Sequence, residues 1–356
     1  MFYVSSHGFG HMTRNLAVME EILEHTDNYI YLASGKLQNR FEKNYLNKYK
    51  HRLIFKDICT DIGLVNQQNT LMVNSKELEE TLYDFIDTWE YIVVEEYHYL
   101  KNFDIRYVIT DISPIGSLVG KQLKVKTIGI SNFTWVEQYE FLGISDSIIK
   151  KFKDAYANLD TFIAYPLALP MNDLKVSKSE IGFITRRIDL KRVNEIKEKY
   201  GKSLFITCGK SANLKSISIQ NYDGTIFTTS GITITGNSKV VKLPINTLDT
   251  QNYIAASDIV ISKAGWSTIS EAVMAKQNLV LIEREDVLED SHNIKQLKKQ
   301  HLAISIKEDE LRTIDIESIK MQCEKNIIFI QNDISLEENK SILDKIGIEV
   351  KTSAIV

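Results

Sequence analysis

The chain has 356 residues, of which 44% are hydrophobic and 25% charged, and 43 basic side chains against 47 acidic ones give a net charge of −4. This length favours two domains over a single core, and the composition is that of a folded globular protein rather than a disordered one. A protein that coats nucleic acid needs an excess of basic side chains, so the charge balance argues against that class of protein. The binding of a small anionic ligand remains compatible with it.

Cysteine usage and hydropathy give the expected compartment. Cys59, Cys208 and Cys323 are an odd number and form no C-x-x-C pair, which favours a reducing cytoplasm. The chain begins with a strand-like run and no secretory pattern, and no apolar run approaches the ~18 residues of a membrane span. We therefore expect a cytoplasmic protein, with peripheral contact with the inner face of the membrane left open.

Short β-rich runs alternate with segments of helical periodicity, the pattern of βα units on a parallel sheet. A first strand is predicted over 1–6. An amphipathic helix follows over 12–24, where Met12, Leu16 and Met19 share one face. Further strands of this first sheet are expected at 29–34, 107–111 and 126–131, with a crossover helix over 113–123. Residues 140–180 carry only a weak pattern.

A second series of strands is predicted after residue 190, at 203–208, 225–230, 240–244, 258–265 and 278–283. The two series predict an α/β protein with two Rossmann-like domains, residues 1–188 and 189–356, whose parallel sheets face one central cleft. The last ~20 residues are expected to pack back on the N-terminal domain.

The first predicted turn, "SHGFGHMTR" (6–14), joins a strand to a helix N-terminus, where free backbone N–H groups suit an anion or an oxyanion. The dinucleotide fingerprint needs a third glycine where Thr13 stands, so a nicotinamide site is disfavoured. His7 and His11 flank the turn without a nearby cysteine or carboxylate cluster that would complete a zinc shell. We expect no metal there.

His11 stands where the helix should begin, so it is a candidate general base for a hydroxyl group. The alternative is a histidine that caps the helix through a local carbonyl, and His7 is expected beside the reacting centre rather than at it. Arg14 fits either a phosphate or a surface carboxylate.

The stretch "SDIVISKAGWSTISEAV" (257–273) is the most informative of the chain. A β-branched strand runs into a glycine turn and a helix opened by Ser267 or Thr268, again an anion-binding N-terminus. Glu271 could accept hydrogen bonds from two vicinal ribose hydroxyls. The alternative is a capping box of Thr268 and Glu271 that needs no ligand.

Three further segments bear on phosphate and sugar binding. The loop "TCGKSAN" (207–213) fails the Walker pattern because Leu204 stands at the required glycine, yet Gly209, Lys210 and Ser211 suit a phosphate contact. No aspartate pair with D-x-D spacing offers a metal site, so charge neutralisation falls to helix dipoles and basic side chains. These candidates are Arg186, Arg187, Lys210 and Lys263. The loop "EDSHN" (289–293) offers polar groups for sugar hydroxyls or is a solvated loop.

Together these motifs resemble the GT-B nucleotide-sugar glycosyltransferases, in particular the group with the bacterial N-acetylglucosaminyltransferase that makes lipid II. The resemblance rests on "GFGHMTRNLAV", "IGFITRR", "SDIVISKAGWSTISEAV" and "DSHN". The stretches "TDISPIGSLVG" and "IGISNFTW" are similar to the glycosyltransferase-like half of plant L-arabinokinase. The resemblance implies a GT-B fold and a metal-independent hexosyltransferase without a cofactor, which uses a nucleotide-sugar donor, UDP-linked in this group, and an acceptor that is lipid-linked or a glycan.

The resemblance also implies roles for single residues. Glu271 would hold the ribose, the turn at Gly265, Ser267 and Thr268 would receive the diphosphate, and backbone groups near Ile245 would meet the base. Arg186 would contact a phosphate, together with the loop at Gly209, Lys210 and Ser211. Asp290, His292 and Asn293 would face the donor sugar. On the acceptor side, His11 would be the base, with Gly10, Thr13, Arg14, Asp111 and Asn132 around it.

Two other functions remain open from the sequence. "GHMTR" also resembles a turn of the UDP-sugar hydrolase of the pseudaminic acid pathway, in which His11 would orient water. The single glycine of "TCGKSAN" is also compatible with a protein that binds sugar nucleotides without turnover.

Overall fold

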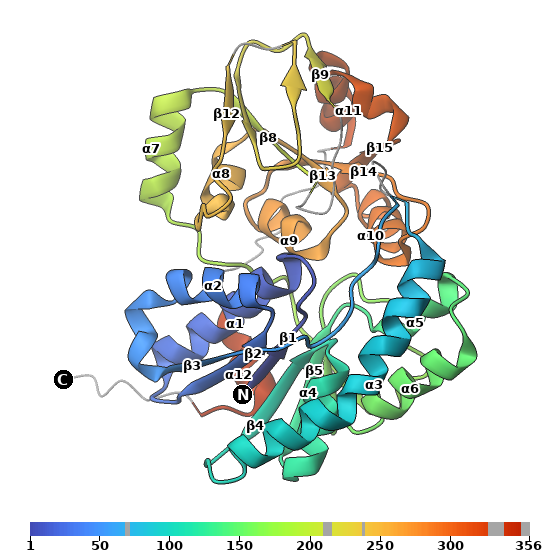
Figure 1. Ribbon diagram of the computed structural model, residues 1–356. Helices are drawn as coiled ribbons and strands as arrows, with labels where there is room; N and C mark the ends of the chain where they lie inside the picture. The colour runs from blue at the N-terminus through green and yellow to red at the C-terminus, as the bar shows by residue number, and fades with distance from the viewer. Residues whose placement is uncertain (68–71, 209–215, 237–238, 327–337, 350–356) are drawn as a thin grey trace, which may run out of the picture. The chain divides into compact units, whose positions relative to one another are not determined.

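The computed structural model describes residues 1–67, 72–208, 216–236, 239–326 and 338–349, and the chain forms two compact units (Figure 1). Unit 1 contains the N-terminal part of the chain up to Ile184 and also the C-terminal helix α12 (Glu338–Ile346). Unit 2 begins at Thr185. It also includes the bridge between Asn66 and Val73. The chain thus leaves unit 1 near the boundary at residue 188 that we expected, and it returns to unit 1 for its last helix.

Unit 1 is built on a seven-stranded parallel sheet in the order β3-β2-β1-β4-β5-β6-β7. Its strands are β1 (Phe2–Val4), β2 (Ile30–Ser34), β3 (Leu53–Asp57), β4 (Tyr107–Asp111), β5 (Lys126–Ser131), β6 (Thr161–Ala164) and β7 (Ser177–Glu180). The strand order reverses between β1 and β4, which is where open α/β sheets bind ligands.

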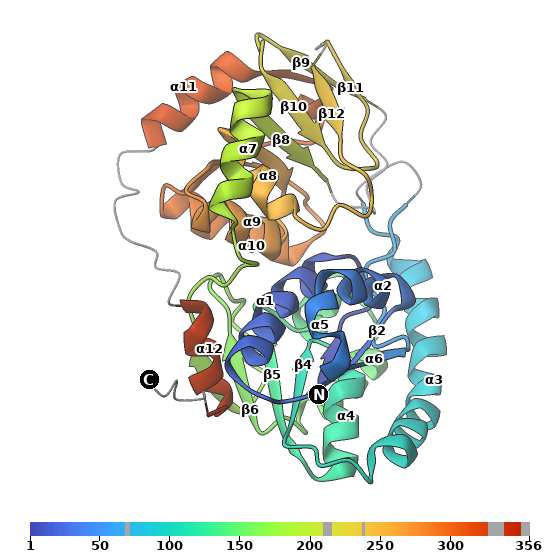
Figure 2. The same cartoon turned by 90° about the vertical axis from the view of Figure 1, so that its left-hand side faces the viewer.

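Two groups of helices cover this sheet, because the reversal of strand order sends the crossovers to its two faces. α1 (Gly10–His25) packs with α2 (Lys36–Tyr45) and with α12 (Figure 2). α3 (Ser75–Leu100), α4 (Pro114–Leu123) and α6 (Asp146–Tyr156) pack together, and α5 (Trp135–Phe141) packs on α6. A 3₁₀ turn, η1 (Asn47–Arg52), precedes β3.

Unit 2 has a six-stranded parallel sheet in the order β12-β10-β8-β13-β14-β15 and a small parallel sheet in the order β11-β9-β16. The strands of the large sheet are β8 (Ser203–Thr207), β10 (Thr225–Thr228), β12 (Val240–Lys242), β13 (Ile259–Lys263), β14 (Asn278–Ile282) and β15 (Ala303–Ile306). Those of the small sheet are β9 (Ile217–Gln220), β11 (Ile234–Thr235) and β16 (Thr313–Asp315). Ile217 and Ile219 of β9 are buried in one cluster with Leu204 and Ile206 of β8, so the small sheet covers the core at this place.

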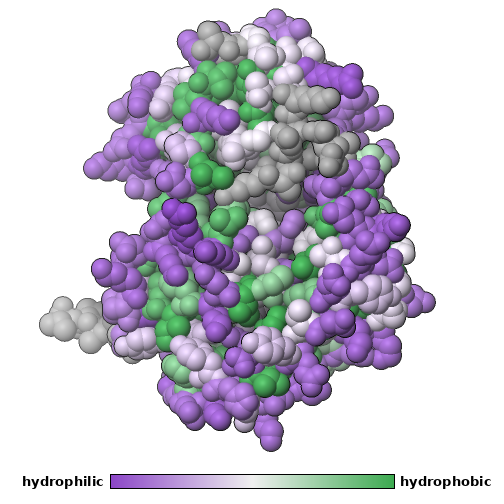
Figure 3. Space-filling view, viewed as in Figure 1, coloured by the Kyte–Doolittle hydropathy of each residue, from purple (hydrophilic) through white to green (hydrophobic). Residues whose placement is uncertain are grey.

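The helices of unit 2 are α7 (Leu190–Tyr200), α8 (Thr250–Ala256), α9 (Trp266–Met274), α10 (Leu288–Lys299) and α11 (Ile316–Asn326), with the 3₁₀ turn η2 (Asp309–Arg312) before β16. Both units therefore have the α/β architecture with parallel sheets that the sequence predicted. In the view of Figure 3, hydrophilic residues cover most of the surface and apolar residues lie scattered among them. None of the helices in the described residues is long and apolar enough to cross a membrane.

Several elements differ from the sequence prediction. The weakly patterned segment 140–180 contains α6, β6 and β7, and the 26-residue helix α3 lies where no element had been predicted. α3 is capped by Asn74, whose side chain accepts a hydrogen bond from the backbone N–H of Glu77. Such an Asn cap is a recognisable start signal in a sequence.

Candidate functional site

His11 is the second residue of α1 and follows the turn that leaves β1. The helix is capped by Phe9 without a side-chain hydrogen bond, so His11 does not serve as its cap, and that alternative is wrong. Its ring is 12% exposed, and Nδ1 lies 3.1 Å from Oδ1 of Asp111 at the end of β4. The fold thus joins a histidine and an aspartate that are far apart in the sequence.

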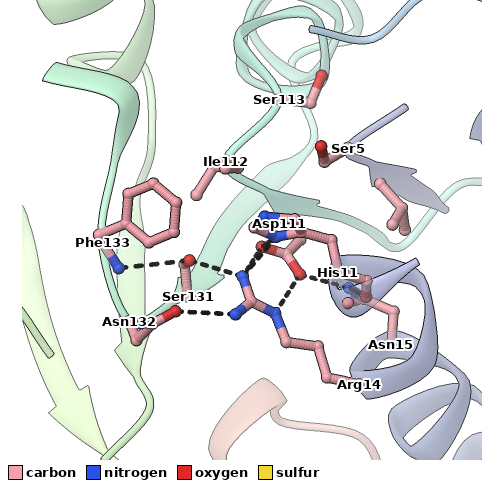
Figure 4. Close-up of polar contacts among 12 residues, drawn as sticks. Ser5, His11, Arg14, Asn15, Asp111, Ile112, Ser113, Ser131, Asn132 and Phe133 are labelled. Carbon is pink, nitrogen blue, oxygen red and sulfur yellow. Dashed lines mark hydrogen bonds and ion pairs between the residues drawn. The ribbon is translucent and has the colours of Figure 1, made fainter. Parts of the chain in front are cut away.

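A buried hydrogen-bond network surrounds the Asp111 carboxylate (Figure 4). Arg14 donates through Nε to Oδ2 of Asp111 at 2.6 Å, and Asn15 donates to the same oxygen at 2.6 Å. Arg14 also donates to Oδ1 of Asn132 and to Oγ of Ser131, both at 2.8 Å. The guanidinium group of Arg14 is planar, and Asp111, Asn132 and Ser131 all accept hydrogen bonds from it. Arg14 therefore fixes the position of the Asp111 carboxylate.

Electrostatics keep Asp111 charged. Burial by itself would raise the pKa of Asp111, but Arg14 and His11 outweigh it and hold that pKa at about 2. A charged carboxylate at this position favours the His11 tautomer that carries its proton on Nδ1.

The tautomer of His11 decides what its ring can do. Nδ1 also lies 2.7 Å from Nη2 of Arg14, which can only donate. If Nδ1 accepts from Arg14, the ring proton is on Nε2, which then has no free lone pair and cannot take a proton from a hydroxyl. If Nδ1–H donates to Asp111, Nε2 presents a free lone pair and can act as a base.

Ile112, directly after Asp111, has a φ of 51°, which is rare for a β-branched residue. Its carbonyl accepts a hydrogen bond of 2.6 Å from the Tyr156 hydroxyl, and Ser113 then caps α4 by accepting from the backbone N–H of Gly116. Strained residues of this kind persist only where neighbours hold them, and they concentrate at functional sites. The bend directs the chain away from Asp111 immediately after the carboxylate.

In unit 2 a turn at Gly265 joins β13 to α9, as the sequence predicted. α9 is capped by Gly265, which makes no side-chain hydrogen bond, and the positive end of the helix dipole lies at this turn. The helix starts at Trp266 rather than at Ser267 or Thr268. Glu271 is therefore not part of a capping box, and that alternative is wrong.

Glu271 is instead paired with a buried arginine. Arg186 is 1% exposed and donates to Oε1 of Glu271 through Nε at 2.9 Å and through Nη2 at 2.7 Å. It also donates to the carbonyl of Leu248 and to the Thr250 hydroxyl. Both of these hydrogen bonds are accepted by Oε1, so Arg186 orients the Glu271 carboxylate through one of its two oxygens.

α10 holds the same turn from the other side. Asp290 and Asn293 are fully buried; Oδ2 of Asp290 accepts from the backbone N–H of Ala264 at 3.3 Å, and Asn293 donates to the Ala264 carbonyl at 2.9 Å. Arg284 donates to the same Asp290 oxygen at 2.6 Å. The two residues, three apart on α10, thus bind both polar groups of the residue that precedes the α9 cap.

Residues 189–343 match the Glycosyltransferase family 28 C-terminal domain. This part of the chain is a glycosyltransferase family 28 C-terminal domain. Gly265 and Glu271 lie within the matched residues, and Arg186 lies just before them. The chain is also 22% identical over 305 residues to L-arabinokinase of Arabidopsis thaliana. This match covers 80% of this chain but only 28% of the length of that enzyme.

Solved structures show that the whole chain has the GT-B fold of UDP-glycosyltransferases. UGT89C1 of Arabidopsis thaliana in complex with UDP superposes with a TM-score of 0.61 at 10% identity, covering 97% of this chain and 98% of that one. UGT2 of Phytolacca americana, in complex with UDP-2-fluoroglucose and pterostilbene, superposes with a TM-score of 0.58 at 10% identity. The match covers 97% of this chain and 92% of that one. A UDP-glucosyltransferase of Polygonum tinctorium that glucosylates indoxyl gives 0.56 at 12% identity, covering 97% of both chains.

In the N-terminal unit, three of the residues that we expected around His11 are buried. Arg14, Asp111 and Asn132 are 3%, 0% and 0% exposed, so in this structure they act on His11 and on one another rather than on an acceptor. Gly10 is exposed and Thr13 half-buried, with the Thr13 hydroxyl bonded to the Gly10 carbonyl at 3.0 Å. Arg14 does pair with a carboxylate, but with a buried one and not with a surface one.

In unit 2, three more of the expected site residues are buried. Asp290 and Asn293 are enclosed and hold the Ala264 backbone, so the direct sugar contact predicted for them does not fit the structure. Arg186 has its guanidinium engaged by Glu271, Leu248 and Thr250, which does not fit the predicted phosphate contact. His292 is half-buried, and the side chain of Ile245 is exposed after Pro244. Gly209, Lys210 and Ser211 lie outside the described residues.

Gly265, Ser267 and Thr268 lie at the start of one helix, as the sequence predicted, but the sequence missed the residues that hold the two sites. Asn15 and Ser131 complete the contacts of Asp111 and Arg14, and Arg284 completes those of Asp290. Asn15 lies one helical turn after His11, a spacing that could have identified it. Within the described residues, no group of three His, Cys, Asp or Glu side chains could hold a metal ion.

Proposed function

We propose that this protein transfers a sugar from a nucleotide diphosphate sugar, UDP-linked, to an acceptor hydroxyl without a metal or a cofactor. The observation that carries the proposal is the contact between His11 and Asp111 in a chain whose second half is a family 28 glycosyltransferase domain. UDP and UDP-sugars bound to the structural neighbours support a uridine nucleotide as the donor.

In the proposed reaction, His11 is the catalytic base. Asp111 accepts a hydrogen bond from Nδ1–H, which leaves Nε2 to take the proton of the acceptor hydroxyl. The oxygen then forms a bond to the anomeric carbon as the bond from that carbon to the diphosphate breaks. Asp111 is a positioning residue, because it stabilises the imidazolium that results.

We assign the donor nucleotide to unit 2. The start of α9, with Ser267 and Thr268, would hold the leaving diphosphate, since a helix N-terminus favours negative charge. Glu271 would accept hydrogen bonds from the ribose hydroxyls through the oxygen that Arg186 leaves unoccupied. Backbone groups near Ile245 would meet the base, while Gly10 and Thr13 would lie on the acceptor side.

Lys263, at the end of β13, is the basic side chain of this turn that could supply charge for the diphosphate. Burial, with the nearby Arg284, lowers the pKa of Lys263. A bound diphosphate would favour its charged form again. We therefore expect donor binding to take up a proton at alkaline pH.

We also propose that the protein works in the cytoplasm and acts on an acceptor that is a glycan or a lipid-linked molecule, with peripheral contact at the inner face of the membrane. Free thiols at Cys59, Cys208 and Cys323 support a reducing compartment.

The test is a transfer assay with radiolabelled nucleotide sugars and lysate acceptors. We expect His11→Ala to lower kcat about 10²- to 10⁴-fold with little change in UDP affinity. The matched control is His51→Ala, an exposed histidine of the same unit. Undiminished transfer by His11→Ala would remove the assigned base, and UDP release that is equally fast without an acceptor would indicate a hydrolase instead.

A further inference from the structure

A pocket of about 480 Å³ opens within unit 1, apart from the His11 ring. It lies at the carboxyl ends of three neighbouring strands. Ser6 and His7 follow β1, Gly35 and Lys36 follow β2, and Asp57 ends β3. Both the position and the size are those of a ligand pocket in an open parallel sheet.

The pocket wall is held in place by buried contacts. Asp61 is 2% exposed; its Oδ1 accepts from the Ser6 backbone N–H at 2.8 Å, and its Oδ2 accepts from the Trp135 indole at 3.0 Å. Gly63 lies against the His7 ring so closely that any Cβ at this position would overlap it. A pocket with such walls is formed before a ligand arrives, which reduces the entropy cost of binding.

The same wall connects the pocket to the proposed base. His11 acts electrostatically on the Asp61 carboxyl, and Ser6 and His7 belong to the turn that leads to His11. A molecule in the pocket therefore lies on the side of unit 1 where we assign the acceptor.

The lining combines polar and apolar groups. The Asp57 carboxyl, the Lys36 ammonium and the Ser6 hydroxyl supply polar groups beside the side chains of Ile58 and Ile62, and the described residues that line the pocket include no Phe, Tyr or Trp. A flat aromatic acceptor gains affinity by stacking its ring on aromatic side chains. A sugar presents hydroxyl groups, each of which loses affinity if it is buried without a partner.

We propose that this pocket is the acceptor subsite of the reaction and that it selects a hydroxyl-rich acceptor, a sugar or polyol, over a flat aromatic one. Asp57 and Lys36 are the specificity-determining residues. Asp57 is exposed and is held through Oδ1 by Asn39 at 2.7 Å, so its carboxylate can accept from vicinal hydroxyls. Lys36 donates to a hydroxyl oxygen beside it. This inference rests on the proposed function.

The experiment uses the full chain with a UDP-sugar that it turns over and two acceptor panels, methyl glycosides and disaccharides in one and phenols and flavonols in the other. We expect transfer to the first panel, and we expect Asp57→Ala and Lys36→Ala each to raise the acceptor KM at least tenfold with UDP affinity unchanged. Asp84→Ala, an exposed carboxylate on α3, is the control and should leave KM as it is. Transfer to phenols alone, or an unchanged KM in both pocket variants, overturns the proposal.

A second readout separates this proposal from the proposed function. Saturation-transfer NMR of methyl glycosides on the UDP-loaded chain needs no turnover. Signals that Asp57→Ala abolishes and Asp84→Ala keeps support the pocket even if no sugar is transferred, in which case the transfer reaction is what fails. Signals of equal strength in the native chain and Asp57→Ala overturn the pocket assignment.

Discussion

Asp111 combines a chemical role with a role in stability, because its carboxylate contacts His11 and is also the buried partner of Arg14. Its folded pKa of about 2 lies below the ordinary value of 3.8. A carboxyl group with a lowered pKa stabilises the fold above its ordinary pKa and loses that contribution as the pH falls through the folded pKa. The contribution is therefore complete at neutral pH.

We predict that Asp111→Asn removes an acid-dependent part of the stability of unit 1. As the pH falls from about 4 to about 2, the free energy of unfolding of the native chain should decrease by about 2 kcal/mol. The variant lacks the Asp111 carboxylate, so its free energy of unfolding should not show this decrease. Urea unfolding, followed by the fluorescence of Trp89 and Trp135 in a Trp266→Phe background, measures this. Asp84→Asn is the exposed control, and equal acid slopes in native and Asp111→Asn chains would contradict the assignment.

Glu42 of α2 behaves in the opposite way. It is fully buried, neither of its carboxyl oxygens has a hydrogen-bond partner, and burial raises its pKa from 4.5 to about 8. The folded state thus holds a proton that the unfolded state has lost. Stability falls as the pH rises between these two values.

We predict that Glu42→Gln flattens this decline, because an uncharged amide does not titrate. The free energy of unfolding of the native chain should decrease by on the order of 4 kcal/mol between pH 4.5 and pH 8. That of the variant should change much less over the same range. The same unfolding experiment at pH 5 and pH 8 measures it, with Glu90→Gln, exposed on α3, as the control. A native chain equally stable at both pH values would refute this account of Glu42.

At the scale of elements, α10 sets the start of α9. Asp290 accepts a hydrogen bond from the N–H of Ala264, the residue before the Gly265 cap, and Asn293 donates one to the Ala264 carbonyl. A loop held on both sides keeps the N–H groups of the next helix in fixed directions, and preorganised donors bind anions without a cost of ordering.

We predict that Asn293→Ala lowers UDP affinity about 5- to 10-fold, as expected when one hydrogen bond of about 1 kcal/mol that orders the site is lost. Isothermal titration calorimetry with UDP measures the affinity, and a thermal melt of the free chain reports general destabilisation separately. Lys295→Ala, exposed on the same helix, is the matched control. If Asn293→Ala binds UDP as tightly as the control does, α10 has no role in ordering this turn.

At the scale of the whole molecule, unit 1 depends on both ends of the chain. α12 follows unit 2 in the sequence, yet it packs on α1 and buries Ile342, Leu343 and Ile346 completely. Part of the stability of the N-terminal unit is thus encoded near the C-terminus.

We predict that Leu343→Ala destabilises unit 1 by about 2–5 kcal/mol, because it leaves a cavity between α12 and α1. Hydrogen exchange should show lost protection in α1 and unchanged protection in α9. Asp344→Ala, exposed on α12, should change stability by less than about 0.5 kcal/mol. Faster exchange in α9 alone would mean that α12 does not stabilise unit 1.

The sequence by itself determined the class of the fold and the central strands of both large sheets, since a short-range pattern is enough for both. β4 and β5 have the predicted bounds, and the start of α9 follows the predicted glycine turn, because β-branched runs and glycines act on their own neighbourhood. The small sheet β11-β9-β16 and helix α3 were not predicted, since tertiary packing rather than local propensity decides such elements.

Only the tertiary structure decided which polar residues belong together. Arg14 and Asp111 are 97 positions apart, and Arg186 and Glu271 are 85 apart, so no local pattern could pair them or show that both arginines are buried. We expected Asp290 and Asn293 to contact the donor sugar, but in the structure both are buried and bond the backbone of Ala264. The physical reason is that a residue's type and spacing limit the chemistry it can do, whereas its partners and its access to solvent come from contacts between distant parts of the chain.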